Sequence, residues 1–89
     1  MTKWKLELTE AFDTSFCKLD IATQNRVYTF LNTKLLHHPD PQKLAKSLQG
    51  NLKGLQRFRV GDYRILTKIK HDVLMIIAID VQHRREIYH

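Results

Sequence analysis

The spacing of apolar residues changes twice along this chain of 89 residues, and these changes restrict its fold more than any other feature. Trp4, Leu6 and Leu8 alternate with polar residues, as in a strand with one buried face. Apolar residues then recur at helical intervals, and after Gly54 they alternate again among many β-branched residues. The sequence predicts a strand, then helices, then several strands.

Two helices are expected, because the sequence offers two residues that can each cap the start of a helix. Thr9 precedes a short apolar face that includes Phe12 and Phe16, and Asp20 precedes a second face that ends before Pro39. The proline-containing residues 39–54 predict a connector with one helical turn at residues 43–48. Alternating runs then cover residues 55–60, 63–69, 73–81 and 86–88, and Gly61-Asp62 and His71-Asp72 supply the first two turns.

This order predicts one α+β domain over residues 1–89. Its N-terminal strand and helical hairpin precede antiparallel strands that form a four-stranded sheet, with the helices on one face. The nearly all-apolar residues 74–79 are typical of a central strand. The one cysteine, Cys17, excludes an internal disulfide, fits a reducing compartment and is expected to be at least half buried. No signal-peptide stretch or segment of about 20 apolar residues is present, which predicts a cytoplasmic protein without a membrane partner.

Charge is divided unevenly along the sequence. Residues 1–42 carry five basic and five acidic side chains, whereas residues 43–89 carry ten Lys and Arg against four Asp and Glu. The whole net charge of +6 therefore lies in the second part. Such an asymmetry favours a polyanionic partner, either nucleic acid or a strongly acidic protein.

Several of five arginines can meet on one face of the predicted sheet. Arg57 and Arg59 are two residues apart on one strand, so both side chains lie on the same face. Arg64 returns to this region after the tight turn, while Arg84 and Arg85 follow the buried strand. Arginine suits phosphate because its planar fork donates two hydrogen bonds and keeps its charge. This pattern indicates a phosphate-binding surface, although any one of these arginines alone is more typical of a solvated strand.

Aromatic and imidazole side chains flank this arginine set. Tyr63 and Tyr88 can stack on the bases of single-stranded RNA, with Tyr63 also suited to the core. His83 and His89 bracket the final segment, and histidine is the side chain best suited to proton transfer near neutral pH. His37 and its neighbours lack the spacing of a metal site, so we expect no metal and no cofactor.

Three strings of the sequence together resemble the RelE/ParE toxin superfamily. They are Asn-Leu-Lys-Gly at residues 51–54, Arg-Phe-Arg-Val-Gly-Asp-Tyr-Arg-Ile at residues 57–65, and His-Arg-Arg-Glu-Ile-Tyr at residues 83–88. The resemblance covers nearly the whole chain. It implies a RelE-like fold and a type II toxin that a small cognate antitoxin neutralises, the complex binding operator DNA through the antitoxin.

The RelE-like branch implies an endoribonuclease that cuts messenger RNA in the ribosomal A site, in contact with 16S ribosomal RNA, and inhibits translation without a metal. In that scheme the ribose 2′-hydroxyl attacks the adjacent phosphate, which gives a 2′,3′-cyclic phosphate and a free 5′-hydroxyl. Carried over by motif, Arg64 and Arg84 stabilise the phosphate, and Tyr88 stacks on a base or helps to transfer a proton. His83 is the first candidate for the general base and His89 the second.

The remaining matched residues are expected to bind substrate: Lys53, Arg57, Arg59, Arg85 and His89. Arg57 and Arg59 stand where some members carry lysines, and arginine is a poor proton acceptor. Two alternatives stay open on the same fold. One is a ParE-like inhibitor of DNA gyrase without nuclease activity, and the other is a degenerate toxin that only binds its antitoxin and operator DNA.

Overall fold

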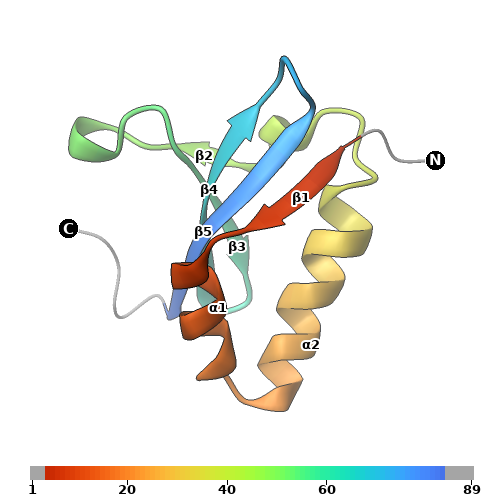
Figure 1. Cartoon of the computed structure of the whole chain (residues 1–89), viewed down its shortest axis with the longest axis vertical. Helices are drawn as coiled ribbons and strands as arrows, with labels where there is room; N and C mark the ends of the chain where they lie inside the picture. Colours follow the sequence, from red (N-terminus) through yellow and green to blue (C-terminus); the bar gives the residue numbers. More distant parts are fainter. Residues whose placement is uncertain (1–3, 84–89) are drawn as a thin grey trace.

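A computed structural model describes residues 4–83 of the chain. Its strands form one five-stranded sheet in the order β1-β5-β4-β3-β2, and α1 and α2 lie against one face of this sheet (Figure 1). The α+β fold class predicted from the sequence is confirmed. Within the described part of the chain, no helix is long and apolar enough to cross a membrane.

The elements have the following bounds. The strands are β1 (Lys5–Leu8), β2 (Lys46–Ser47), β3 (Gln56–Val60), β4 (Tyr63–Lys70) and β5 (Met75–His83). The helices are α1 (Glu10–Cys17) and α2 (Ile21–Thr29), and α2 continues into the π-helical η1 (Phe30–Leu35). The connector holds two 3-10 turns, η2 (Pro41–Leu44) and η3 (Gly50–Leu52).

Both helices begin at the predicted caps. The Thr9 hydroxyl accepts a hydrogen bond from the Phe12 N–H at 3.1 Å, which satisfies one of the free donors of the first turn of α1. The Asp20 carboxylate accepts from the Thr23 N–H at 3.4 Å and from the Thr23 hydroxyl. The hydrogen bond from this hydroxyl is the main reason why the pKa of Asp20 lies below its ordinary value.

Strands β3, β4 and β5 form the predicted antiparallel meander. Val60 pairs with Tyr63, so Gly61 and Asp62 make the two-residue turn, and Gly61 adopts the left-handed φ of 58° that such a turn requires. β5 is an interior strand, flanked by β1 and β4, while β4 holds the central position. The nearly continuous apolar run of β5 is typical of an interior strand, which is better covered than a strand at the edge of a sheet.

Two details of the predicted sheet were wrong. β1 pairs with β5 in parallel, so the sheet is mixed, and Lys46–Ser47 is an edge strand rather than part of a helical turn. Pairing with Gln56 and Arg57 across the sheet holds these two residues extended, which local sequence does not report. The sheet therefore has five strands within residues 4–83, and the run predicted at residues 86–88 lies outside the described residues.

One core joins the helices to the sheet. Its best-buried side chains come from both layers: Phe12, Val27, Leu31, Leu35, Phe58, Ile65, Ile76, Ala78 and Val81. Cys17 is exposed, so its predicted burial was wrong. α1 turns Phe12 into the core and packs Phe16 against it, and Cys17 follows Phe16 by about 100° of helical rotation, which turns it to solvent.

Candidate functional site

The face of the sheet opposite the core carries a row of cationic side chains. Cross-strand partners lie on the same face of a sheet, and Arg59 pairs with Arg64, while Arg57 pairs with Leu66 on one side and Lys46 on the other. Alternation along β3 turns Phe58, between the two arginines, into the core. Residues from three strands thus present their charges together.

These side chains line a hollow, which we call the cationic hollow. Its volume is about 380 Å³, and it is lined by Leu44, Ala45, Lys46, Arg57, Arg59 and Arg64. No acidic residue of the described chain lines it. Arg57 and Arg64 are half buried, whereas Arg59 and Lys46 are exposed, so the floor of the hollow is held by packing while its rim reaches solvent. An arrangement of this kind binds a polyanion.

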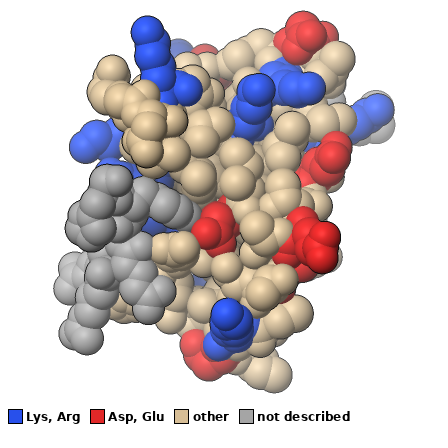
Figure 2. Space-filling model, turned by 60° about the vertical axis from the view of Figure 1, so that its left-hand side comes forward, with Lys and Arg blue, Asp and Glu red and all other residues tan. Residues whose placement is uncertain are grey.

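Both signs of charge lie on the face shown in Figure 2, in unequal shares of its regions. In the view of Figure 2, basic side chains lie mainly in the upper part and along the left-hand margin, and acidic side chains lie mainly in the centre and the right half.

Hydrogen bonds hold one arginine of the cationic hollow and, separately, a carboxylate on β5. The Arg59 Nε donates to the Gly61 carbonyl oxygen at 3.4 Å, so the tight turn helps to orient this guanidinium. Across β5, Gln82 pairs with Arg64 and donates to Asp80 at 2.9 Å. Ser15 also donates to the Asp80 carboxylate, at 2.6 Å. Donors from α1 and β5 thus hold the carboxylate of Asp80, which does not line the cationic hollow.

The structure does not bring His83 to the arginines. His83 pairs with Tyr63, one position away from the pair of Gln82 and Arg64, so it lies on the opposite face of the sheet. Its ring meets the Tyr63 ring edge-on, with centroids 5.1 Å apart. It lines a different hollow, of about 330 Å³, together with Ser15, Lys18 and other residues.

The other predicted site residues are placed as follows. Lys53 is exposed directly after η3 and does not line the cationic hollow. Arg84, Arg85, Tyr88 and His89 lie outside the described residues. Residues 4–83 contain no cluster of three or more His, Cys, Asp or Glu side chains that could hold a metal ion.

Lys46 is a member of the hollow that the sequence did not predict. It stands in the connector, where isolated lysines have no periodicity that would distinguish a site residue from a solvated one. Its register opposite Arg57 is what places it in the site. A lysine also differs chemically from its three neighbours, because an ammonium group can release a proton whereas arginine stays protonated in proteins.

Comparisons with known structures give the same fold. The toxin of the RelBE2 toxin–antitoxin complex from Mycobacterium tuberculosis is 24% identical, with a TM-score of 0.84 over 92% of this chain and 99% of that one. The archaeal RelE–RelB complex from Pyrococcus horikoshii gives 20% identity and a TM-score of 0.73 over 96% and 99%. The isolated E. coli RelE toxin is 16% identical, with a TM-score of 0.70 over 90% of this chain and 83% of the RelE chain.

The comparison with curated proteins finds no significant match. The family model that describes the ParE toxin of the type II toxin–antitoxin system parDE matches residues 6–88, which is nearly the whole chain. Together with the fold, this match shows that the chain belongs to the ParE toxin family, within the RelE/ParE superfamily of type II toxins.

Proposed function

We propose that this toxin is a metal-independent endoribonuclease that cuts messenger RNA in the ribosomal A site and thereby inhibits translation. The observation that carries the proposal is the convergence of Arg57, Arg59 and Arg64 on one hollow of the sheet. Three guanidinium groups around a space of this size suit a phosphodiester, whose transition state gathers negative charge on the phosphoryl oxygens.

The proposed reaction is an internal transfer within the RNA. The ribose 2′-oxygen attacks the adjacent phosphorus, the new P–O2′ bond forms as the P–O5′ bond breaks, and the products are a 2′,3′-cyclic phosphate and a 5′-hydroxyl. Arg64 and its neighbours stabilise the charge of the pentacovalent phosphorane. The proton of the 2′-hydroxyl leaves to a base, and the 5′-oxygen takes up a proton as it departs.

We assign the second proton to Lys46. Among the four cationic side chains that line the hollow, it is the one with a transferable proton. We propose that the base comes from elsewhere, because the register puts His83 on the other face of the sheet. Tyr88 and His89 follow in sequence and are the proposed base candidates, with Arg84 and Arg85 as further phosphate ligands.

The proposed partners are a cognate antitoxin, messenger RNA on the ribosome with contacts to 16S ribosomal RNA, and operator DNA reached through the antitoxin. Two of the similar structures are toxin–antitoxin complexes, which supports the first of these. The cationic hollow supports a polyanionic partner in general.

Inhibition of DNA gyrase is the second candidate function. It is favoured by the match to the family model of the parDE toxin, because ParE-like members share this fold without cutting RNA. In that case the cationic hollow would contact an acidic surface of the target rather than a scissile phosphate.

Primer extension on cellular messenger RNA after brief induction separates the two candidates. We expect breaks at fixed codon positions with the unaltered toxin and their loss with Arg64→Ala. Lys70→Ala is the matched control, because it removes one positive charge at the exposed far end of β4. Intact messages together with arrested growth and inhibited supercoiling would reject the nuclease in favour of the gyrase inhibitor.

A further inference from the structure

The sheet has an open edge on the side of β3. β2 pairs only with Gln56 and Arg57, and one more backbone hydrogen bond joins Leu48 to Leu55. Within the described chain, no strand covers the outer side of Phe58 and the two residues that follow it. An uncovered strand edge presents backbone N–H and C=O groups that can pair with another extended chain.

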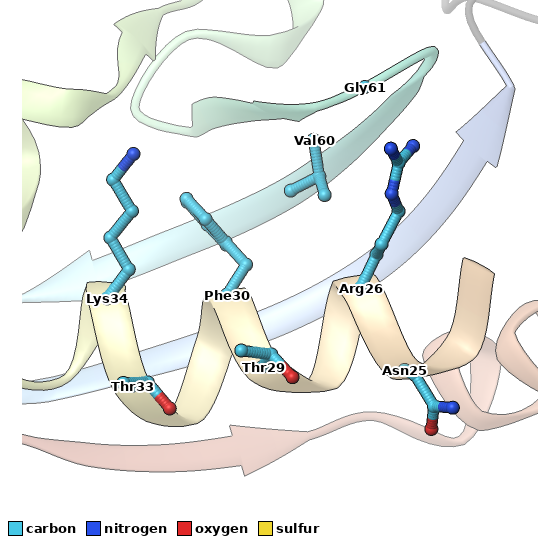
Figure 3. A pocket seen from close by; sticks show the side chains of 8 residues that line it. All are labelled: Asn25, Arg26, Thr29, Phe30, Thr33, Lys34, Val60 and Gly61. Carbon is cyan, nitrogen blue, oxygen red and sulfur yellow. The ribbon is translucent and has the colours of Figure 1, made fainter. Parts of the chain in front are cut away.

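A groove runs between this edge and the second helix, and we call it the α2–β3 groove. Its volume is about 540 Å³, and it is lined by Asn25, Arg26, Thr29, Phe30, Thr33, Lys34, Val60 and Gly61. In Figure 3, Arg26, Phe30 and Lys34 project from the helix toward β3 and its turn. These three are spaced four residues apart and therefore share one helical face.

The groove is apolar in its middle and positive at both ends. Phe30 is anchored to the core, with its ring centroid 5.8 Å from that of Phe58, and Val60 stands across from it in Figure 3. The Arg26 guanidinium lies over the β-turn, where a Cβ added to Gly61 would come within 3.1 Å of its Nη1. Lys34 stands at the other end, and no acidic residue of the described chain lines the groove.

We propose that the α2–β3 groove binds an extended acidic segment of the antitoxin, which adds to β3 as a strand along residues 58–60. This inference rests on the antitoxin proposed above as the partner, and it is independent of RNA cleavage. The opposite side of β3 is already paired to β4, so the incoming strand would extend the sheet from its open side.

The geometry also specifies a sequence pattern in that segment. Arg26 and Lys34 are eight positions apart, and because the segment from Phe30 onward is π-helical, the α-helical rise of about 1.5 Å per residue gives about 12 Å as an upper bound on their separation along the axis. Four residues of extended chain cover about 13 Å, and residues at even spacing in a strand lie on one face. Two carboxylates four residues apart therefore reach the two cations, and the residue midway between them places an apolar side chain over Phe30. The expected pattern is acidic, any, apolar, any, acidic.

An acidic peptide and RNA both match the two cations in charge. The peptide is favoured because the apolar centre between the cations suits an aliphatic side chain and the open edge offers backbone partners that only a polypeptide matches in register. RNA would leave those N–H and C=O groups unpaired. Binding of ribosomal RNA in the groove is therefore the competing outcome of the test.

The test uses the full toxin and the antitoxin encoded beside its gene, with titration calorimetry at low salt. We expect Arg26→Glu and Lys34→Glu each to weaken binding by about tenfold or more, as expected when a close opposite charge becomes a like charge. Lys70→Glu is the matched control, since it makes the same charge change outside the groove, and its affinity should stay unchanged. Thermal melting checks that each variant is folded.

Hydrogen exchange of the unaltered complex gives a second readout that needs no substitution. Backbone amides of residues 58–60 should gain protection on antitoxin binding. Unchanged affinity of both charge reversals, together with unprotected amides, would reject the groove as the binding site while leaving the antitoxin proposal intact. The absence of any complex with the unaltered toxin would reject both. If Arg26→Glu and Lys34→Glu weaken binding of a 16S ribosomal RNA fragment but leave antitoxin binding unchanged, the groove is assigned to RNA instead.

Discussion

Arg59 and Arg64 occupy directly opposed positions on β3 and β4, so two guanidinium groups share one patch of the open sheet face. Like charges directly opposite each other destabilise a sheet, on the scale of about 0.2–1 kcal/mol for a cross-strand pair. This repulsion is one cost of gathering the two arginines at the cationic hollow, whose lining includes no acidic residue of the described chain. A bound anion would offset it.

Replacement of Arg59 by threonine should therefore have opposite effects on stability and on RNA binding. The free energy of unfolding at low salt should rise by up to about 1 kcal/mol, because repulsion with Arg64 is removed. RNA affinity should fall, with the slope of log affinity against log salt reduced by about 0.7, as for one lost phosphate contact on single-stranded RNA. Denaturant titration measures the free energy of unfolding, and RNA binding at several salt concentrations measures the affinity and its salt dependence. A less stable variant with unchanged RNA affinity would show that Arg59 is structural.

Lys46→Arg should keep the charge of the hollow but lose the proton donor. Cleavage should slow by about 10²–10⁴-fold, the usual contribution of a general acid. An RNA whose 5′-oxygen at the cleavage position is replaced by sulfur should restore the rate, because a thiol has a pKa of about 8.5 and its thiolate leaves without a proton. Arg64→Ala should stay slow on both RNAs. If the sulfur substitution does not rescue Lys46→Arg, Lys46 is not the donor.

His83→Gln should leave cleavage nearly unchanged, because His83 lies on the opposite face of the sheet from Arg64. The substitution removes the edge-on ring contact with Tyr63, so a small loss of thermal stability is expected. Single-turnover cleavage rates across pH 5–8 provide the measurement. A loss of about 10²–10⁴-fold, with the acidic limb of the pH profile removed, would identify His83 as the general base after all.

Thr9→Ala should destabilise the domain by about 1–2 kcal/mol, because the hydroxyl both caps α1 and ties it to the sheet. It accepts from the Phe12 N–H and donates to the Ile79 carbonyl oxygen at 2.7 Å. Thr9→Ser keeps the hydroxyl and serves as the control, with most of the stability retained. Chemical denaturation compares the variants. Equal losses in both would mean that the methyl group of Thr9, rather than its hydrogen bonds, carries the effect.

The sequence by itself determined the elements that depend on neighbouring residues. Thr9 and Asp20 cap helices through residues three positions away, and Gly61 allows a two-residue turn because of its own backbone freedom. The alternation of β3 places Arg57 and Arg59 on one face for the same local reason. The family string at residues 57–65 spans this strand and this turn, which is why the family could be predicted along with the fold class.

Only the tertiary structure decided which distant residues meet. Lys46 has no local signal, and it enters the cationic hollow because β2 pairs with Arg57 across the sheet. The register of β4 with β5 turns His83 away from Arg64, although both belong to the family strings. The groove beside Phe30 exists because β2 is only two residues long and leaves the end of β3 uncovered. Strand register and edge pairing are set by contacts between residues far apart in the chain, and local patterns carry no record of them.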